Sequence, residues 1–218
     1  MNRRIYKLLL FCMVSMLSVF VHAASLQVTY QIGDNVAVTS STSTEGNLAT
    51  LLGGEDNAMK VTQLSVKGYL NEADISLLQK MAGSTEGTGC LKSLNLSEAT
   101  FTATGKTVPE KIFQNCKNLQ QVDLSNMTEI GKLAFNNCAL TEISIPASVT
   151  IIRAQAFMNC SALKTLEFVA GTPENELVLE TEAFFGCGNM DLANDGVLPS
   201  RIISIAARTF QKCGITKL

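Results

Sequence analysis

The chain has 218 residues, in which 17 lysines and arginines nearly balance 19 aspartates and glutamates, with one histidine and no tryptophan. The single histidine, His22, lies in an N-terminal segment that we expect to be removed, so the mature protein is expected to have no imidazole. This composition excludes Ser-His-Asp catalytic triads, histidine acid–base steps and zinc sites built on histidine.

Residues 1–23 are predicted to be a secretory signal peptide. Three basic residues precede an apolar run at 8–21, and small residues lead up to a cleavage site at Ala23. The run is shorter than the roughly 18 residues of a membrane-spanning helix, and the large Phe11 argues against lipid attachment at Cys12. We therefore expect a secreted or cell-surface protein with no transmembrane anchor in the mature chain. Cleavage removes three basic residues and leaves 14 against 19 acidic ones, which makes nucleic acid an unsuitable partner.

Residues 24–89 alternate strand and helix patterns. In chain order we expect a strand from Ser25 with a turn at 33–35, a Ser/Thr-rich segment at 39–44, a short helix at 45–52 and a strand at 61–67. A second helix should follow, because Asn71 and Asp74 have the spacing of a capping box and Ile75, Leu78 and Met81 mark one apolar face. A loop of small polar residues at 83–89 ends the region.

From residue 90 onward the chain repeats one pattern. The motif Phe-x-x-Cys occurs five times, with steps of 22, 22, 27 and 26 residues between the phenylalanines. An apolar residue stands five positions before each phenylalanine, and a run of the type L-x-x-L-x-L follows the first three. A period in the twenties is typical of a solenoid, in which the motif residues form a core ladder. They are Phe113 and Cys116, Phe135 and Cys138, Phe157 and Cys160, Phe184 and Cys187, and Phe210 and Cys213.

The repeats at 90–218 are expected to number about five and to end in an incomplete one. Extra residues after Phe168 and after Met190 interrupt the period, and we expect both insertions to be irregular and mobile. Each unit of a solenoid buries its apolar side only against a neighbour, so we assign 24–89 as an N-terminal capping region. The segment 213–218 copies the start of a repeat and stops. We expect an open edge there, which either pairs end to end with another copy or reflects truncation of a longer protein.

Six cysteines remain after the expected cleavage, five of them at one phase of the repeat. An even number in an exported chain is typical of disulfides. Residues at one phase, however, lie above one another in successive coils, so we expect buried, reduced thiols that bond backbone carbonyls in tight turns. The sequence has no Cys-x-x-Cys pair and no zinc-ligand spacing, and we expect neither a metal nor a cofactor.

The motifs L-x-x-L-x-L, Ala-Phe-x-x-Cys and IPASVTIIRAQAF together resemble the BspA-like leucine-rich repeat proteins of bacteria. The resemblance covers 90–218, and the stretch VTQLSVKGYLNEADISLLQKMA is similar to the region ahead of the repeats in other members. It implies an α/β repeat solenoid, with a parallel β-sheet on the concave side and short helical or irregular turns on the convex side. Members are often secreted or cell-surface proteins, and some are implicated in adhesion to host proteins or to other cells.

In such a sheet the residues between the apolar positions point outward on the concave side. Taking one position per strand gives a candidate binding face of Lys67, Asn95, Asp123, Ser144 and Glu167. The face is polar and mildly acidic and has no aromatic anchor. It is therefore either a specific site or a merely solvated surface.

Three classes of function fit these observations. The leading hypothesis is a binding module that recognises a protein or glycan through the concave face, as in adhesion. The alternative is a self-associating structural surface protein with no specific ligand. A glycan-active enzyme is the remote alternative, because Asp123 and Glu142 would come close on neighbouring coils, but nothing in the sequence shapes a pocket around them. We expect no catalytic residues and no enzymatic activity.

Overall fold

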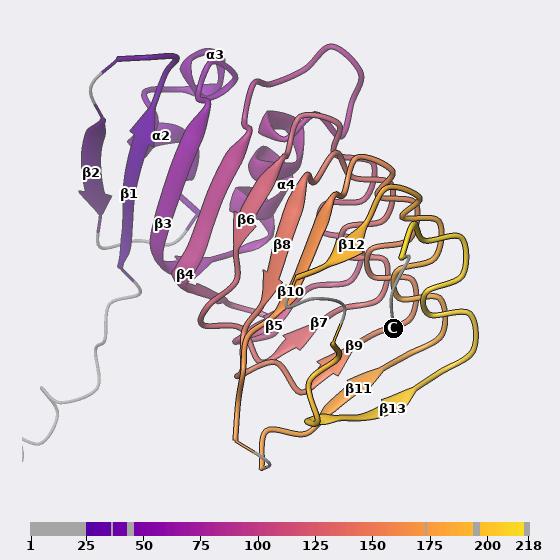
Figure 1. Ribbon diagram of the computed structural model, residues 1–218. Coiled ribbons are helices and arrows are strands. Elements are labelled where there is room, and N and C mark those ends of the chain that lie inside the picture. Colours follow the sequence, from indigo (N-terminus) through magenta and orange to yellow (C-terminus); the bar gives the residue numbers. More distant parts are fainter. Residues whose placement is uncertain (1–24, 36, 43–45, 173, 194–196, 216–218) are drawn as a thin grey trace, which may run out of the picture.

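The strands of the repeats form two rows that run side by side (Figure 1). The computed structural model describes residues 25–35, 37–42, 46–172, 174–193 and 197–215. The predicted signal peptide, residues 1–23, lies outside the described residues. The described chain is a repeat solenoid with parallel sheets and little helix, which confirms the predicted fold class.

The N-terminal region begins with an antiparallel hairpin. Strand β1 (Leu26–Gln31) pairs on one side with β2 (Val38–Thr42) and on the other with β3 (Gln63–Leu70). Between the hairpin and β3 lie two single-turn helices, α2 (Leu48–Leu51) and α3 (Glu55–Ala58). The expected helix at 45–52 is thus shorter than predicted, and α3 and the edge strand β2 were not predicted.

The next helix, α4 (Glu72–Met81), begins at the capping box that the sequence predicts. The Asn71 side chain accepts hydrogen bonds from the backbone N–H groups of Ala73 and Asp74, and Asp74 accepts one from the N–H of Asn71. Asp74 also accepts bonds from Gly46 and Leu48. Its carboxylate is 1% exposed, so these bonds tie the start of α4 to α2 and compensate its burial.

The concave row continues from the hairpin through the repeats. After β3 come β4 (Ser93–Phe101), β6 (Gln121–Asp123), β8 (Glu142–Ile145), β10 (Thr165–Phe168) and β12 (Asp191–Leu192). The pairing order is β2-β1-β3-β4-β6 in one sheet and β12-β10-β8 in the other, and all pairs from β3 onward are parallel. Where the two sheets meet, the N–H of Thr141 donates to the carbonyl of Gln120 at 2.9 Å.

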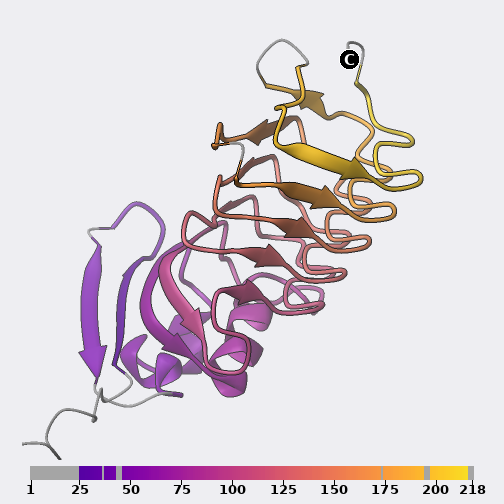
Figure 2. The same cartoon turned by 90° about the horizontal axis from the view of Figure 1, so that it is seen from below.

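A second parallel sheet runs along the molecule beside the concave row (Figure 2). It consists of β5 (Thr107–Val108), β7 (Glu129–Ile130), β9 (Ile151–Ile152), β11 (Leu177–Leu179) and β13 (Ile202–Ile205). The apolar residues five positions before each phenylalanine lie in these strands. Val108, Ile130, Ile152 and Leu179 are buried in the core, whereas Ile205 is exposed. The expected turns follow each strand, but the sequence did not reveal the sheet that precedes them.

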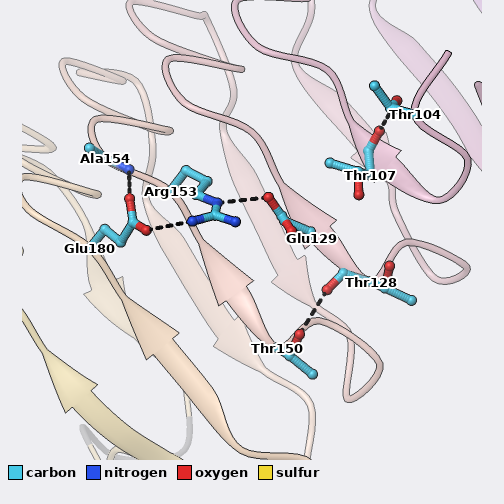
Figure 3. A network of polar contacts seen from close by, with 8 residues as sticks. All are labelled: Thr104, Thr107, Thr128, Glu129, Thr150, Arg153, Ala154 and Glu180. Carbon is cyan, nitrogen blue, oxygen red and sulfur yellow. Dashed lines mark hydrogen bonds and ion pairs between the residues drawn. The ribbon is translucent and has the colours of Figure 1, made fainter.

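Polar side chains link successive coils along the outside of this second sheet (Figure 3). The Nε of Arg153 donates to Glu129 at 2.7 Å and its Nη1 donates to Glu180 at 3.0 Å, while Glu180 also accepts from the N–H of Ala154. The hydrogen bonds with Glu129 and Glu180 raise the pKa of the guanidinium, so it stays charged. Because these side chains are partly exposed, the ion pairs contribute little to stability and mainly fix the register of the coils.

The five motif phenylalanines stack in one column through the core. Their ring centroids are 5.5, 5.2, 5.0 and 5.6 Å apart in chain order, with interplanar angles of at most 22°. Phe113, Phe135, Phe157 and Phe184 are fully buried, whereas Phe210 in the last described coil is partly exposed. Stacked rings with offset overlap add attraction beyond the area that they bury.

No helix in the described part of the chain combines the length and the apolar character that crossing a membrane requires.

Candidate binding groove

A groove of about 580 Å³ lies on the concave face, across β4, β6, β8 and β10. Its lining comes mainly from the outward-pointing positions of these four strands and from the residues that follow them. They are Ser93, Leu94, Asn95, Gln121, Val122, Asp123, Leu124, Ser125, Glu142, Ile143, Ser144, Pro146, Thr165, Glu167 and Val169. The curvature of the stacked coils therefore makes one continuous depression out of residues that are up to 76 positions apart in the sequence.

Four of the five residues predicted for the binding face line this groove. Asn95 is in register with Asp123 between β4 and β6, and Ser144 is in register with Glu167 between β8 and β10. The four side chains thus belong to two neighbouring pairs, one on each sheet of the concave row.

Lys67 does not lie with the other four. The pairing of β3 with β4 shifts by one residue between Ser65 and Lys67, which places Lys67 opposite Glu98. Its ammonium lies 2.6 Å from that carboxylate, and Lys67 is not among the groove-lining residues. Lys67 therefore lies outside the groove that the other four residues line.

A repeated turn fixes the two groove residues of the first sheet. Asn95 Oδ1 accepts the N–H of Ser97 at 2.8 Å, and Asp123 Oδ1 accepts the N–H of Ser125 at 2.9 Å. The Ser125 hydroxyl also donates to Asp123 Oδ1. A hydrogen bond from the side chain to the backbone two residues on holds a short polar side chain in one orientation, so these two groups are preorganised before any ligand arrives.

The groove carries negative charge. Asp123, Glu142 and Glu167 contribute carboxylates, and among the described residues no lysine or arginine contributes to the lining. The Nε2 of Gln121 donates to Glu142 at 2.8 Å, across the boundary between the two concave sheets. The remaining polar lining consists of hydroxyl and carboxamide groups, which can both donate and accept hydrogen bonds.

The depression extends toward the N-terminus. A second cavity of about 280 Å³ lies over β1, β3 and β4 and shares Ser93 and Asn95 with the groove. Sequence analysis missed this extension, because β1 was not recognised as a neighbour of β3. It also missed Pro146 and Val169, which form the rim at the ends of β8 and β10.

The ladder cysteines serve the structure of the turns and lie away from the groove. All six described cysteines are free; Cys116, Cys138, Cys160 and Cys187 are buried, Cys213 is half-buried and Cys90 is exposed. From Cys138 onward each ladder thiol donates to a carbonyl of the preceding coil, at 3.2 Å to Cys116, 3.1 Å to Phe135, 3.2 Å to Phe157 and 3.0 Å to Phe184. The last three carbonyls also accept an N–H of their own turn. Burial raises the pKa of Cys116 and of Cys160 to about 12, so both remain protonated thiols.

The described side chains form no metal centre. Within the described ranges, no three histidine, cysteine, aspartate or glutamate side chains gather in a way that could hold a metal ion.

Stacked coils with a parallel concave sheet, a phenylalanine column and a polar groove define a leucine-rich repeat solenoid. The chain belongs to the family described as the BspA type leucine rich repeat region, whose model matches six copies over residues 85–217. No curated protein matches the sequence. Among solved structures, the crystal structure of the pneumococcal vaccine antigen PcpA is similar at 24% sequence identity and a TM-score of 0.43. The similarity covers 56% of this chain and 29% of that one, so the chain spans less than a third of that protein's length.

Proposed function

We propose that this protein is an exported binding module that recognises a protein or glycan ligand through its concave groove. The observation that carries the proposal is the groove itself, in which polar residues from four successive strands meet over about 580 Å³. Extended concave surfaces of this kind are how solenoid proteins bind their partners. Membership of the BspA-type family adds support, because repeats of this class occur in surface proteins.

Export is part of the proposal and rests on the sequence of residues 1–23. Basic residues, an apolar run and the cleavage-site pattern Val21-His22-Ala23 are typical of a secretory signal. Whether the protein stays on the cell surface or is released would follow from cell fractionation with an antibody against the repeats.

Recognition explains the groove better than catalysis. Two of its polar groups, Asn95 and Asp123, each accept the backbone N–H of the residue two positions on, and Glu142 accepts a hydrogen bond from Gln121. A surface of oriented donors and acceptors without a deep pocket suits the contact of a large ligand more than the enclosure of a small one.

Probing immobilised glycans and extracellular proteins with the purified chain tests the proposal. We expect retention of a defined ligand class at micromolar concentration, with saturation and with competition by the free ligand. Absence of saturable binding to both kinds of array would contradict the proposed function.

Self-association is a second candidate, favoured by apolar side chains in the last described coil. Val197 is 68% exposed, Ile203 56% and Ile205 48%. Ile205 occupies the position that is buried in the earlier coils at Ile130, Ile152 and Leu179, and here its side chain is exposed. A second copy of the chain that packs against this coil would bury it.

Sedimentation velocity over a concentration series tests this second candidate. We expect a reversible dimer, and Ile203→Lys combined with Ile205→Lys should shift it to the monomer. A strictly monomeric wild-type protein at high micromolar concentration would contradict self-association through this coil and would leave the groove proposal intact.

A further inference from the structure

Arg201 is a buried cation that the repeat pattern does not explain. It precedes β13 and is 3% exposed, and among the described residues no carboxylate forms an ion pair with it. Burial lowers the pKa of its guanidinium. A charge removed from water without a counter-ion is costly unless other groups solvate it, so its hydrogen bonds indicate its role.

The Arg201 guanidinium is solvated by backbone carbonyls of the two preceding coils. Its Nη1 donates to Val149 at 3.0 Å and to Asn175 at 3.3 Å, and its Nη2 donates to Pro146 at 3.1 Å. Its Nε is buried with no partner. The planar head group therefore bridges the turn 146–149, which follows β8, and the insertion 169–176, which follows β10.

The insertion packs closely on this arginine. A Cβ atom placed on Gly171 would lie 3.3 Å from Arg201 Cδ and 3.2 Å from Ala147 Cβ, so the backbone approaches both side chains where only glycine fits without adjustment. Thr172 and Asn175 close the insertion as a turn, because Asn175 Oδ1 accepts from both the N–H and the hydroxyl of Thr172. The segment is irregular, as expected from the sequence, and near its C-terminal end it is held by the hydrogen bond from Arg201 to the Asn175 carbonyl.

Both segments held by Arg201 begin at the rim of the groove. Pro146, whose carbonyl accepts from Nη2, lines the groove at the end of β8, and Val169, the first residue of the insertion, lines it at the end of β10. We propose that Arg201 is a positioning residue that holds the turn 146–149 and the described residues of the insertion, 169–172 and 174–176, together as one wall of the groove. The inference rests on the proposed function, because it assigns Arg201 to the shape of that binding site.

The arrangement requires an arginine and not merely a positive charge. A guanidinium presents donors in a flat fork that can reach carbonyls on two segments at once, whereas a lysine ammonium is a compact charge on a flexible chain. Arg201→Lys therefore keeps the charge and removes the bridge. Arg208→Lys is the matched control, because Arg208 lies in the same coil and is exposed, with an ion pair to Glu182.

Hydrogen exchange of the full chain, followed by mass spectrometry, tests the inference. In Arg201→Lys we expect peptides covering 169–177 to exchange at least tenfold faster, and peptides covering 108–138 to stay within twofold of wild type. Arg208→Lys should match wild type in both regions. Unchanged exchange at 169–177 would overturn the proposal, and so would equal acceleration in every coil, which would assign Arg201 to global stability alone.

This readout needs no ligand. A chain that binds nothing on the arrays could still show the local effect of Arg201→Lys, and a chain that binds could lack it. The experiment can therefore contradict the role proposed for Arg201 without contradicting the proposed function, and the reverse also holds.

Discussion

The motif phenylalanines stack in one column but differ in burial, which makes the column testable one residue at a time. Phe157 is fully buried and stacked on both sides, with centroids at 5.2 and 5.0 Å. Phe210 is partly exposed, and within the described chain it stacks only on Phe184. The two positions should therefore differ in what truncation costs.

Phe157→Ala should lower the free energy of unfolding by about 3–5 kcal/mol, because it removes a buried ring and leaves a cavity. Phe210→Ala should lower it by roughly half as much, since that ring buries less. Urea melts followed by circular dichroism measure both. Val197→Ala, at an exposed position, is the control and should change little. A shift below about half a kcal/mol for Phe157→Ala would contradict the repeat register.

The buried thiols predict a loss of stability at alkaline pH. The folded pKa of Cys160 is raised by burial to about 12, from an ordinary value of 9.0. Below pH 9 the thiol is protonated in both folded and unfolded chains and has no effect. Between pH 9 and 12 only the unfolded chain releases the proton, so stability falls by about 1.4 kcal/mol per pH unit for each such thiol.

Cys160→Ala removes one of these thiols. In urea melts with a reductant, stability should decline less steeply with pH than in wild type between pH 9 and 10, by about 1 kcal/mol per unit, and with little difference between pH 8 and 9. The change in slope is the readout, since the cavity lowers stability equally at every pH. Identical slopes would show that this thiol is not shielded in the folded protein.

At the scale of elements, each repeat turn contains residues with left-handed backbone conformation. Lys111, Leu133, Gln155, Glu182 and Arg208 stand two positions before the phenylalanines, with φ between 56° and 61°. Non-glycine residues are strained there, by about 1–2 kcal/mol. The turn geometry is therefore set by the stacked hydrogen bonds of neighbouring coils and not by local preference.

Lys111→Gly should leave stability unchanged or raise it by about 0.5 kcal/mol, because relief of strain offsets the greater freedom of glycine in the unfolded chain. The matched substitution Lys132→Gly, at an exposed turn position without positive φ, should lower stability by about 0.5–1 kcal/mol. Thermal melts of the two variants decide the matter. A loss for Lys111→Gly as large as that for Lys132→Gly would show that the turn tolerates its φ without strain.

The elements that could be predicted are those with repeated apolar positions. The L-x-x-L-x-L runs gave the concave strands β4, β6, β8 and β10, since alternation reports which side of a strand is buried. Strand β2 could not be found that way, because it is a polar edge strand with no fully buried residue. The second sheet was missed because most of its strands have two residues and one inward side chain, too few to show alternation.

The candidate site could be predicted where residues occupy the same position in successive repeats, because such residues lie side by side in the sheet. Asn95, Asp123, Ser144 and Glu167 share one phase and line one groove. Lys67 departs because it does not share that phase: Ser65 is the β3 residue in register with Asn95, and Lys67 lies two residues further along the strand. Arg201 was invisible for another reason: its partners are backbone carbonyls 26 to 55 residues away, and any residue type can supply a carbonyl.

On the scale of the whole molecule, the residues that hold the coils together differ from the residues that form the binding face. The phenylalanine column, the cysteine ladder and the second sheet hold the coils in register, while the concave positions are free to vary in chemistry. Charge reversal in the groove should therefore leave folding nearly unchanged. The negative groove of Asp123, Glu142 and Glu167 should make the affinity for any ligand that contacts it sensitive to that change.

The most direct test compares two double variants of equal charge change. Asp123→Lys with Glu167→Lys alters the groove, and Glu86→Lys with Glu110→Lys alters exposed positions outside the groove and its wall. Affinity is measured by biolayer interferometry for the ligand retained on the arrays, with melting temperatures as the check on folding. The account predicts at least a tenfold change in affinity for the groove variant, less than twofold for the control, and similar melting temperatures. Equal affinities for the groove variant and wild type would contradict it and place ligand binding elsewhere on the solenoid.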